Sequence, residues 1–178
     1  MPEAEAAGWV SPGEMAAAQG FLREHRRREY LTWRAIVRRE LGTDVGIAYD
    51  AAGAPVVDRD GVHIGVSHCR GWVAVCISDA PCAVDIELVS RNFSRAVPRY
   101  MSSAEQALSD DPLLPAVVWC AKETLYKYAG RPGLDLLRDL HVESVDFAAG
   151  TVVGRIGSGE AVRLSLRTAD GLVAVYIF

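Results

Sequence analysis

Apolar residues recur along the chain with two different periods, which predicts a mixture of helices and strands. Between Met15 and Leu41 they return at roughly helical spacing, and Gly42 supplies a stop. From Ile64 onward, short runs rich in valine and isoleucine are bounded by glycine or proline, as strands are. The other elements expected are strands at Ile64–Val66, Trp72–Ser78, Ala83–Val89, Val142–Phe147 and Thr151–Ile156, a connection at Ser67–Gly71, helical turns within Arg91–Asp111, a helix at Pro115–Ala129 and a final hairpin at Ala161–Phe178.

The final hairpin repeats the first at a shift of about 100 residues. Ile64–Ser78 then lies over Leu164–Phe178, with Gly71 on Gly171, and Trp33 falls more loosely on Trp119. Glycine-centred, valine-rich hairpins also resemble one another by chance, which is the alternative. A true repeat predicts an α+β fold in one domain, 1–178. It would have two similar halves, about 9–90 and 91–178, each a long helix on a small antiparallel sheet, related by a pseudo-twofold axis.

The composition is that of a globular protein. The chain has 178 residues, half of them hydrophobic, which suffices for one compact core. Its four cysteines show no Cys-x-x-Cys spacing, so neither a disulfide framework nor a zinc cluster is expected. We see no secretory signal and no apolar run that would span a bilayer. These features favour a cytoplasmic protein without a membrane partner, and the two-half organisation favours a monomer.

Charge is unevenly distributed. The net charge of -4 gives no general attraction to nucleic acid. Between Phe21 and Gly42, however, seven arginines stand against three glutamates. A solvated helix face explains that excess as well as a site for a multiply phosphorylated ligand does.

Two carboxylates stand close together in the third predicted strand. Asp85 and Glu87 are two residues apart, so on a strand both point to the same side. Such a pair needs a counter-ion, and magnesium, which prefers oxygen ligands and bridges to phosphates, is the best candidate. The alternative is an edge strand whose solvent face is acidic.

A third carboxylate lies in the second helix. Glu123 and Lys127 are four residues apart and share a helix face, with Lys122 beside them. Such pairs are often surface ion pairs of small energy. Because Trp119 and Tyr126 suggest a packed helix, these charges need another explanation. Glu123 would be a third carboxylate for the metal, and a lysine ammonium would bind a phosphate oxygen.

Ser67 and His68 form a weaker candidate. A histidine at a strand end is usually structural, and the surrounding sequence is not a nucleophile elbow. We therefore interpret both residues as hydrogen-bond donors to phosphate and not as covalent catalysts.

The order of these motifs resembles the 4'-phosphopantetheinyl transferase superfamily, and specifically its Sfp-type branch. The resemblance is carried by Ser67-His68-Cys69, by Ala83-Val84-Asp85-Ile86-Glu87, and by Trp119-Cys120-Ala121-Lys122-Glu123 with Lys127. It implies a pseudo-dimer of two α+β halves. It also implies transfer of phosphopantetheine from coenzyme A to a serine of an acyl or peptidyl carrier protein, with release of 3',5'-ADP.

The resemblance also implies roles for single residues. Asp85, Glu87 and Glu123 would hold Mg2+, and Glu123 would take the proton of the carrier serine. Lys127 would stabilise the leaving phosphate, with Lys122 nearby. Contacts to coenzyme A would come from Ser67, His68 and the arginine-rich helix, in particular Arg26 to Arg28 and Arg34. Of these, Arg27 and Arg34 are taken as the site residues, and which arginine matters is left open.

The chain departs from the family pattern at one place. A basic residue often precedes the proline in a Gly-Lys-Pro or Gly-Arg-Pro segment, whereas this chain has Gly53-Ala54-Pro55. A contact to the 3'-phosphate is then absent, or comes from Arg59 or the helix arginines. Two alternative functions stay open: a non-catalytic module that binds a carrier or coenzyme A, and a metal-dependent phosphodiesterase.

Overall fold

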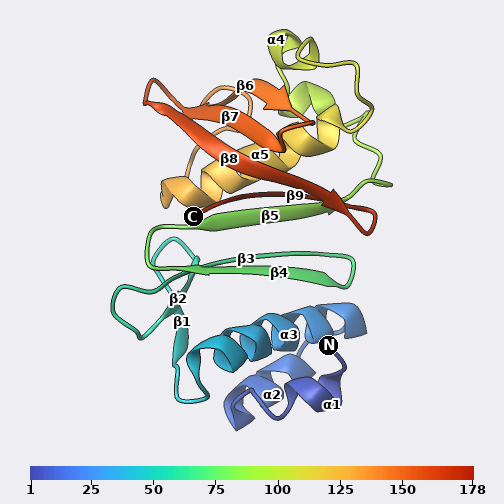
Figure 1. Ribbon diagram of the computed structural model, residues 1–178. Coiled ribbons are helices and arrows are strands. Elements are labelled where there is room, and N and C mark those ends of the chain that lie inside the picture. Colours follow the sequence, from blue (N-terminus) through green and yellow to red (C-terminus); the bar gives the residue numbers. More distant parts are fainter.

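A computed structural model describes all 178 residues of the protein (Figure 1). It is an α+β fold with one five-stranded antiparallel sheet and two two-stranded sheets. No helix combines the length and apolarity needed to cross a bilayer. The helices are α1 (Glu3–Ala6), α2 (Pro12–Gln19), α3 (Glu24–Leu41), the 3-10 turn η1 (Val97–Arg99), α4 (Ser103–Gln106) and α5 (Leu114–Ala129). The strands are β1 (Ile47–Tyr49), β2 (Pro55–Val57), β3 (His63–Cys69), β4 (Trp72–Ser78), β5 (Ala83–Leu88), β6 (Leu140–Asp146), β7 (Thr151–Ile156), β8 (Ala161–Ala169) and β9 (Leu172–Ile177).

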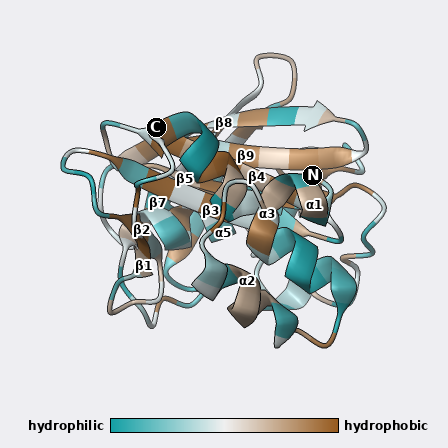
Figure 2. Ribbon diagram, turned by 90° about the horizontal axis from the view of Figure 1, so that it is seen from below, coloured by the Kyte–Doolittle hydropathy of each residue, from teal (hydrophilic) through white to brown (hydrophobic).

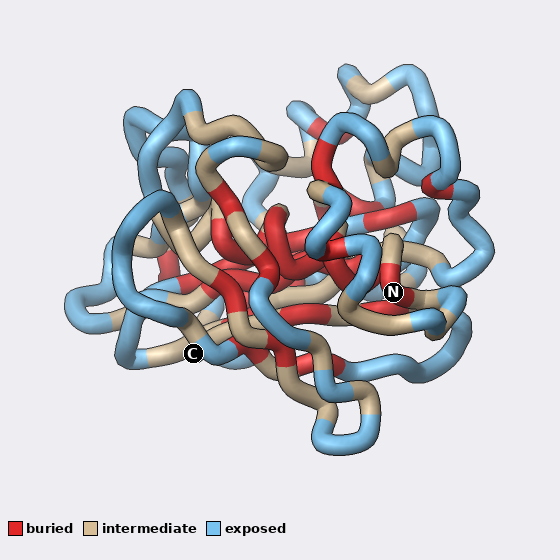
Figure 3. Tube along the Cα trace, turned by 90° about the horizontal axis from the view of Figure 1, so that it is seen from above, coloured by how far each residue is buried: buried red, intermediate tan, exposed pale blue.

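The elements form successive layers. Figure 1 shows α3 lying along the β3–β4 hairpin, the hairpin facing the large sheet, and α5 against that sheet. The strand order of the large sheet is β5-β9-β8-β7-β6. Its main core lies between the sheet and α5, and smaller apolar clusters fill the spaces between α3 and the hairpin and between the hairpin and β5. In Figure 3 the buried residues run through the middle of the trace, with exposed loops around them.

The predicted single helix Met15–Leu41 is wrong, because the chain bends after Gly20. Ser11 caps α2 by accepting from the N–H of Glu14, whose carboxylate accepts from the N–H of Ser11 in return. This capping box starts the first helix before Met15. Gly20 ends it, and α3 begins at Glu24 and ends at Gly42, whose φ of 111° suits glycine. Figure 2 shows teal, hydrophilic residues along much of α3, whereas α2 is coloured mostly tan.

The first hairpin is longer than expected. We predicted Ser67–Gly71 as a connection, but β3 continues to Cys69, which pairs with Trp72. Only Arg70 and Gly71 form the turn, with φ values of 41° and 88°. The strand continues because its alternation of buried and exposed side chains continues through Ser67, His68 and Cys69.

The second hairpin has the same turn. Ala169 pairs with Leu172, and the two turn residues, Asp170 and Gly171, have φ values of 53° and 75°. Positive φ at both positions is typical of a two-residue type I' turn. The predicted correspondence of the two hairpins is therefore confirmed in register and turn. The boundary near residue 90 does not separate the sheets, because β5 pairs with β9 in the large sheet.

Candidate active site between the hairpin and the large sheet

The carboxylates of β5 face helix α5. Asp85 and Glu87 lie opposite Val175 and Val173 of β9, and directly opposed residues on antiparallel strands share a face. Both valines belong to the core cluster under α5. Asp85 is buried and Glu87 half-buried. The expectation that both side chains point to one side is confirmed.

The carboxylate of Asp85 is held by two donors at the same oxygen. The Ser67 hydroxyl donates to Asp85 Oδ1 at 2.8 Å, and the Lys127 ammonium donates to the same atom at 2.8 Å. The Ser67 oxygen also accepts from the N–H of Ile86 at 3.2 Å. Residues from β3, β5 and α5 thus meet at one carboxylate, and the ion pair of Asp85 with Lys127 was not among the sequence-based expectations.

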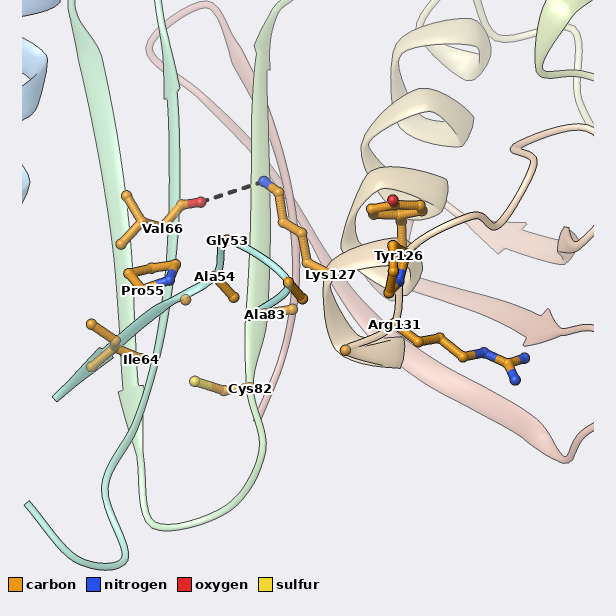
Figure 4. Close-up of a pocket in the computed structure, with 14 residues that line it drawn as sticks. Gly53, Ala54, Pro55, Ile64, Val66, Cys82, Ala83, Tyr126, Lys127 and Arg131 are labelled. Carbon is orange, nitrogen blue, oxygen red and sulfur yellow. Dashed lines mark hydrogen bonds between the residues drawn. The ribbon is translucent and has the colours of Figure 1, made fainter. Parts of the chain in front are cut away.

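Lys127 bridges the unpaired edges of β3 and β5. Its ammonium donates to Val84 O at 2.9 Å. It donates more weakly to Val66 O at 3.4 Å, the bond drawn in Figure 4. An ammonium has three N–H donors, so the bonds to these carbonyls and to Asp85 use all of them. The side chain is still 31% exposed. The long bond to Val66 is therefore the one that a ligand oxygen would most easily replace.

Glu123 lies on α5, one turn before Lys127. Burial, and then the nearby charge of Asp85, raises the pKa of the Glu123 carboxyl above its usual range, against the lowering effect of Lys127 and Arg91. No hydrogen bond contributes to this shift. Glu123 is therefore a carboxylate without a donor, close to a second carboxylate, in a partly buried place. These are the properties of a proton acceptor or a cation ligand.

Glu87 is paired differently. Its carboxylate accepts from the guanidinium of Arg91, four residues later. That guanidinium also lies 4.8 Å and 4.6 Å from the ring centroids of Phe93 and Trp119, within cation–π range. Arg91 did not appear among the predicted site residues, and its sequence position after the strand gave no sign of this contact.

His68 meets the N-terminal part of α3. The Arg26 guanidinium donates to His68 Nδ1 at 2.9 Å and to the buried carboxylate of Glu29 at 3.0 Å. The same Arg26 nitrogen lies 3.4 Å from Nε2. Because arginine cannot accept and its contact with Nδ1 is the shorter one, Nδ1 is assigned as the acceptor and Nε2 as the protonated nitrogen of the neutral ring. Burial, and then the charge of Arg26, lowers the pKa of His68 despite the nearby Glu29. His68 is thus a neutral N–H donor at neutral pH.

The arginine beside His68 is Arg26, which belongs to the predicted group Arg26 to Arg28 but is neither Arg27 nor Arg34. Arg27 instead contacts Glu3 of α1 at 3.1 Å. Arg34 is 3% exposed, donates to the hydroxyl of Tyr49, and has its guanidinium carbon 3.5 Å from the ring centroid of Tyr30. The selection of Arg34 as a coenzyme A contact is therefore wrong, because its guanidinium is enclosed within the helical layer. Arg26 and Glu29 are three residues apart, a spacing that placed them together on one helix face.

The expected role of Lys122 is also corrected. This lysine has no exposed surface, and its ammonium donates to Tyr100 O at 2.6 Å, to Leu136 O at 2.9 Å and to the Glu105 carboxylate at 2.7 Å. All three donors are used inside the protein. Lys122 is a structural residue that cannot reach a phosphate, although its neighbour Glu123 points into the site region.

Two cavities adjoin the Asp85 cluster. One, of about 280 Å³, lies between the β2–β3 region and the end of α5, and its walls include Ala54, Val66, Lys127 and Arg131. Figure 4 shows Arg131 extending away from Ala54. The other, of about 610 Å³, has a polar lining. Its lining residues are His68, Cys69, Arg70, Glu87, Leu88, Ser90, Arg91 and Asn92.

The atoms of this site that could bind a metal ion are carboxylate oxygens. No group of three or more histidine, cysteine, aspartate or glutamate side chains lies close enough to hold a metal ion. Two carboxylates, Asp85 and Glu123, are nevertheless near enough for one to shift the pKa of the other. Oxygen donors of like charge suit a hard divalent cation, so the donor chemistry fits magnesium. In the structure, Lys127 and Arg91 balance the charges of Asp85 and Glu87.

Comparison with known proteins adds one finding. The family model described as the 4'-phosphopantetheinyl transferase superfamily matches residues 81–171. No curated protein sequence matches the chain. The matched segment runs from just before β5 to the turn between β8 and β9, so it contains Asp85, Glu87, Glu123 and Lys127 but not Ser67 or His68.

Proposed function

Because the chain belongs to the 4'-phosphopantetheinyl transferase superfamily, we propose that it transfers phosphopantetheine from coenzyme A to a serine of an acyl or peptidyl carrier protein. Release of 3',5'-ADP would complete the reaction. One observation carries this proposal: Glu123, a carboxylate without a hydrogen-bond donor, lies beside Asp85 and one helical turn from Lys127. A non-catalytic binding protein has no evident use for that arrangement.

The residues divide the chemistry among them. The serine oxygen forms a bond to the β-phosphorus of coenzyme A while the bond to the departing 3',5'-ADP breaks. Glu123 would accept the serine proton, because its carboxylate has no hydrogen-bond donor of its own in the structure. Lys127 donates to the phosphate oxygens on the departing side, and its weak bond to Val66 O is the one exchanged.

Magnesium would be held by Asp85 and Glu123. Glu87 does not form a group of three with them in the structure, and it would become the third ligand only by leaving its partner Arg91. When bound, it would neutralise charge on the diphosphate. His68 would donate through Nε2 to a phosphate of coenzyme A, with Arg26 holding the ring. Arg26 is 46% exposed, so its charge is available to the ligand as well.

The finer assignments follow from the same proposal. The matching turns of the two hairpins support the Sfp-type branch with pseudo-twofold halves. We place the protein as a monomer in the cytoplasm, where its four free thiols stay reduced. Coenzyme A and the carrier protein are its partners. We expect no role for nucleic acid or for a membrane.

A coupled set of measurements tests this function. Purified protein is incubated with coenzyme A, Mg2+ and a panel of apo carrier proteins, and 3',5'-ADP is followed by chromatography. We expect release only when all three are present. Glu123→Gln and Asp85→Asn should lower the rate by roughly 100-fold or more, the usual range for loss of a general base.

A matched control and a binding measurement complete the test. Glu143→Gln removes an exposed carboxylate whose only partner is Arg155, and it should leave the rate unchanged. Calorimetry with coenzyme A alone distinguishes a binding protein from an enzyme. Tight binding without any 3',5'-ADP release on every carrier would favour the non-catalytic module.

A further inference from the structure

Ser67 presents its hydroxyl to the inside of the protein. The residue lies on β3, is 6% exposed, and alternates with the exposed His68. Its oxygen meets the unpaired edge of β5, where the N–H of Ile86 donates to it at 3.2 Å. Ser67 therefore occupies the junction between the hairpin and the large sheet and does not line either cavity described above.

The hydroxyl has a single proton, and that proton is in use. Ser67 Oγ donates it to Asp85 Oδ1 at 2.8 Å in a buried position. A hydroxyl can accept further bonds but has no second proton to donate. Ser67 can therefore donate to a phosphate only by releasing Asp85, which would leave a buried carboxylate oxygen short of a donor.

The two bonds to Asp85 Oδ1 are not equivalent. The second comes from Lys127, which is partly exposed and lines the smaller cavity. In the proposed reaction Lys127 turns part of its charge toward a phosphate, which weakens its hold on Asp85. Ser67 has no such second task. Its bond is the one that keeps the carboxylate plane fixed while Oδ2, which receives no N–H or O–H, stays available.

We infer that Ser67 is a positioning residue that orients Asp85 for a divalent cation and does not itself contact coenzyme A. This inference rests on the proposed function, because the cation is the magnesium of that reaction. The hydrogen-bond partners of metal ligands fix ligand orientation, and their loss usually lowers metal affinity about 10- to 100-fold. The role differs from the phosphate contact expected from the sequence, and the two have different consequences on mutation.

Two binding measurements without turnover separate these roles. Ser67→Ala is compared with the wild type for Mn2+ binding, followed by electron paramagnetic resonance, and for coenzyme A binding without metal, followed by calorimetry. We expect Mn2+ affinity to fall about 10-fold or more, with metal-free coenzyme A affinity within about 2-fold of wild type. Ser67→Thr, which keeps the hydroxyl, should recover most of the Mn2+ affinity.

The control accounts for loss of a buried hydroxyl in general. Thr124 donates to Val175 O at 2.9 Å and is fully buried on α5, so Thr124→Val removes a comparable bond outside the site. It should lower the melting temperature and leave Mn2+ affinity unchanged. If Ser67→Ala is too unstable to purify, the same comparison is made with Ser67→Cys, which retains a weak donor.

Three results would overturn the inference. If Ser67→Ala weakens metal-free coenzyme A binding and leaves Mn2+ affinity unchanged, Ser67 contacts a phosphate of coenzyme A, as expected from the sequence. Unchanged values for both would leave Ser67 a purely structural residue. Absence of Mn2+ binding by the wild type would remove the cation itself. A wild type whose Mn2+ affinity depends on Ser67 but which transfers nothing would instead contradict the proposed function alone.

Discussion

Two lysines of one helix show how position decides what a charged side chain does. Lys122 and Lys127 are both on α5, yet Lys122 is fully enclosed with Glu105 while Lys127 reaches a cavity wall. Burial lowers the pKa of Lys122, although the partner carboxylate opposes that effect. The sequence placed Lys127 on the helix face of Glu123 and Lys122 beside it, but it could not tell that the Lys122 side chain is buried inside the protein.

Lys122→Met should destabilise the fold without changing the chemistry. Removing one partner of a buried ion pair leaves the other charge uncompensated, which costs about 3–5 kcal/mol. Urea denaturation should show that loss, while the transfer rate per folded molecule stays near wild type. Arg155→Met breaks the exposed pair with Glu143 and should cost below about 1 kcal/mol. A stable Lys122→Met protein with a lost rate would contradict the structural role.

Glu14 joins α2 to α3 and makes stability depend on pH. It accepts from Arg38 at 2.5 Å and 3.1 Å and lies 3.3 Å from Arg34 Nε. Burial raises the pKa of Glu14, but the hydrogen bonds from Arg38 and Ser11 outweigh burial and set it below 4.5. Because the pKa of Glu14 is lower in the folded protein than in the unfolded chain, the ionised carboxylate stabilises the fold. This stabilisation is complete above the pKa of the unfolded chain and is lost as the pH falls through the pKa of the folded protein.

Glu14→Gln should therefore be less stable than wild type at pH 7, by about 3 kcal/mol, because two nearly buried arginines lose their counter-charge. As the pH falls from 4.5 through the lower pKa of folded Glu14, the wild type loses this advantage and the two curves converge. Denaturation across that range measures it. A stability difference independent of pH would show that the ion pair is not its source.

At the scale of elements, the junction between β3 and β5 has no backbone ladder. Ser67 and Lys127 supply the hydrogen bonds that a pairing strand would otherwise make, to the N–H of Ile86 and the carbonyl of Val84. The two side chains that make hydrogen bonds to this unpaired edge therefore also hold Asp85. We interpret this as the reason why the site lies at the seam between the hairpin and the large sheet.

The two hairpins offer a direct test of their correspondence. Gly71 and Gly171 both have positive φ, and a methyl group at either position would meet no atom within 4 Å. Alanine there costs only the backbone strain, about 1–2 kcal/mol. Thermal unfolding of Gly71→Ala and Gly171→Ala should show similar losses. Gly13→Ala, inside α2 with φ outside that region, should instead gain about 0.5–1 kcal/mol.

A large difference between the two glycine variants would show that the turns are not equivalent.

Strand positions were largely predictable here: Thr151–Ile156 agrees with β7, and β5 ends one residue before the predicted limit. Alternation sets those elements locally. The break between α2 and α3 was missed because a capping box and Gly20 outweigh a helical apolar pattern.

At the scale of the whole molecule, the sequence identified the carboxylates but not their partners. The family resemblance implied that the elements carrying Asp85, Glu87, Glu123 and Lys127 meet. In the structure the charge of Asp85 acts on Glu123, but the three carboxylates do not form one group. The contacts of Arg26 with His68, of Arg91 with Trp119 and of Ser67 with Asp85 join distant segments, which no local pattern records. The family match, too, covers only the second part of this arrangement.

The measurement that tests the account most directly is the intact mass of an apo carrier protein after incubation with this protein, coenzyme A and Mg2+. We predict a gain of one phosphopantetheine, located on a single serine by fragmentation. The gain should be absent when Glu123→Gln replaces the wild type. Unchanged mass for every carrier tested, with coenzyme A bound and intact, would contradict the transferase assignment.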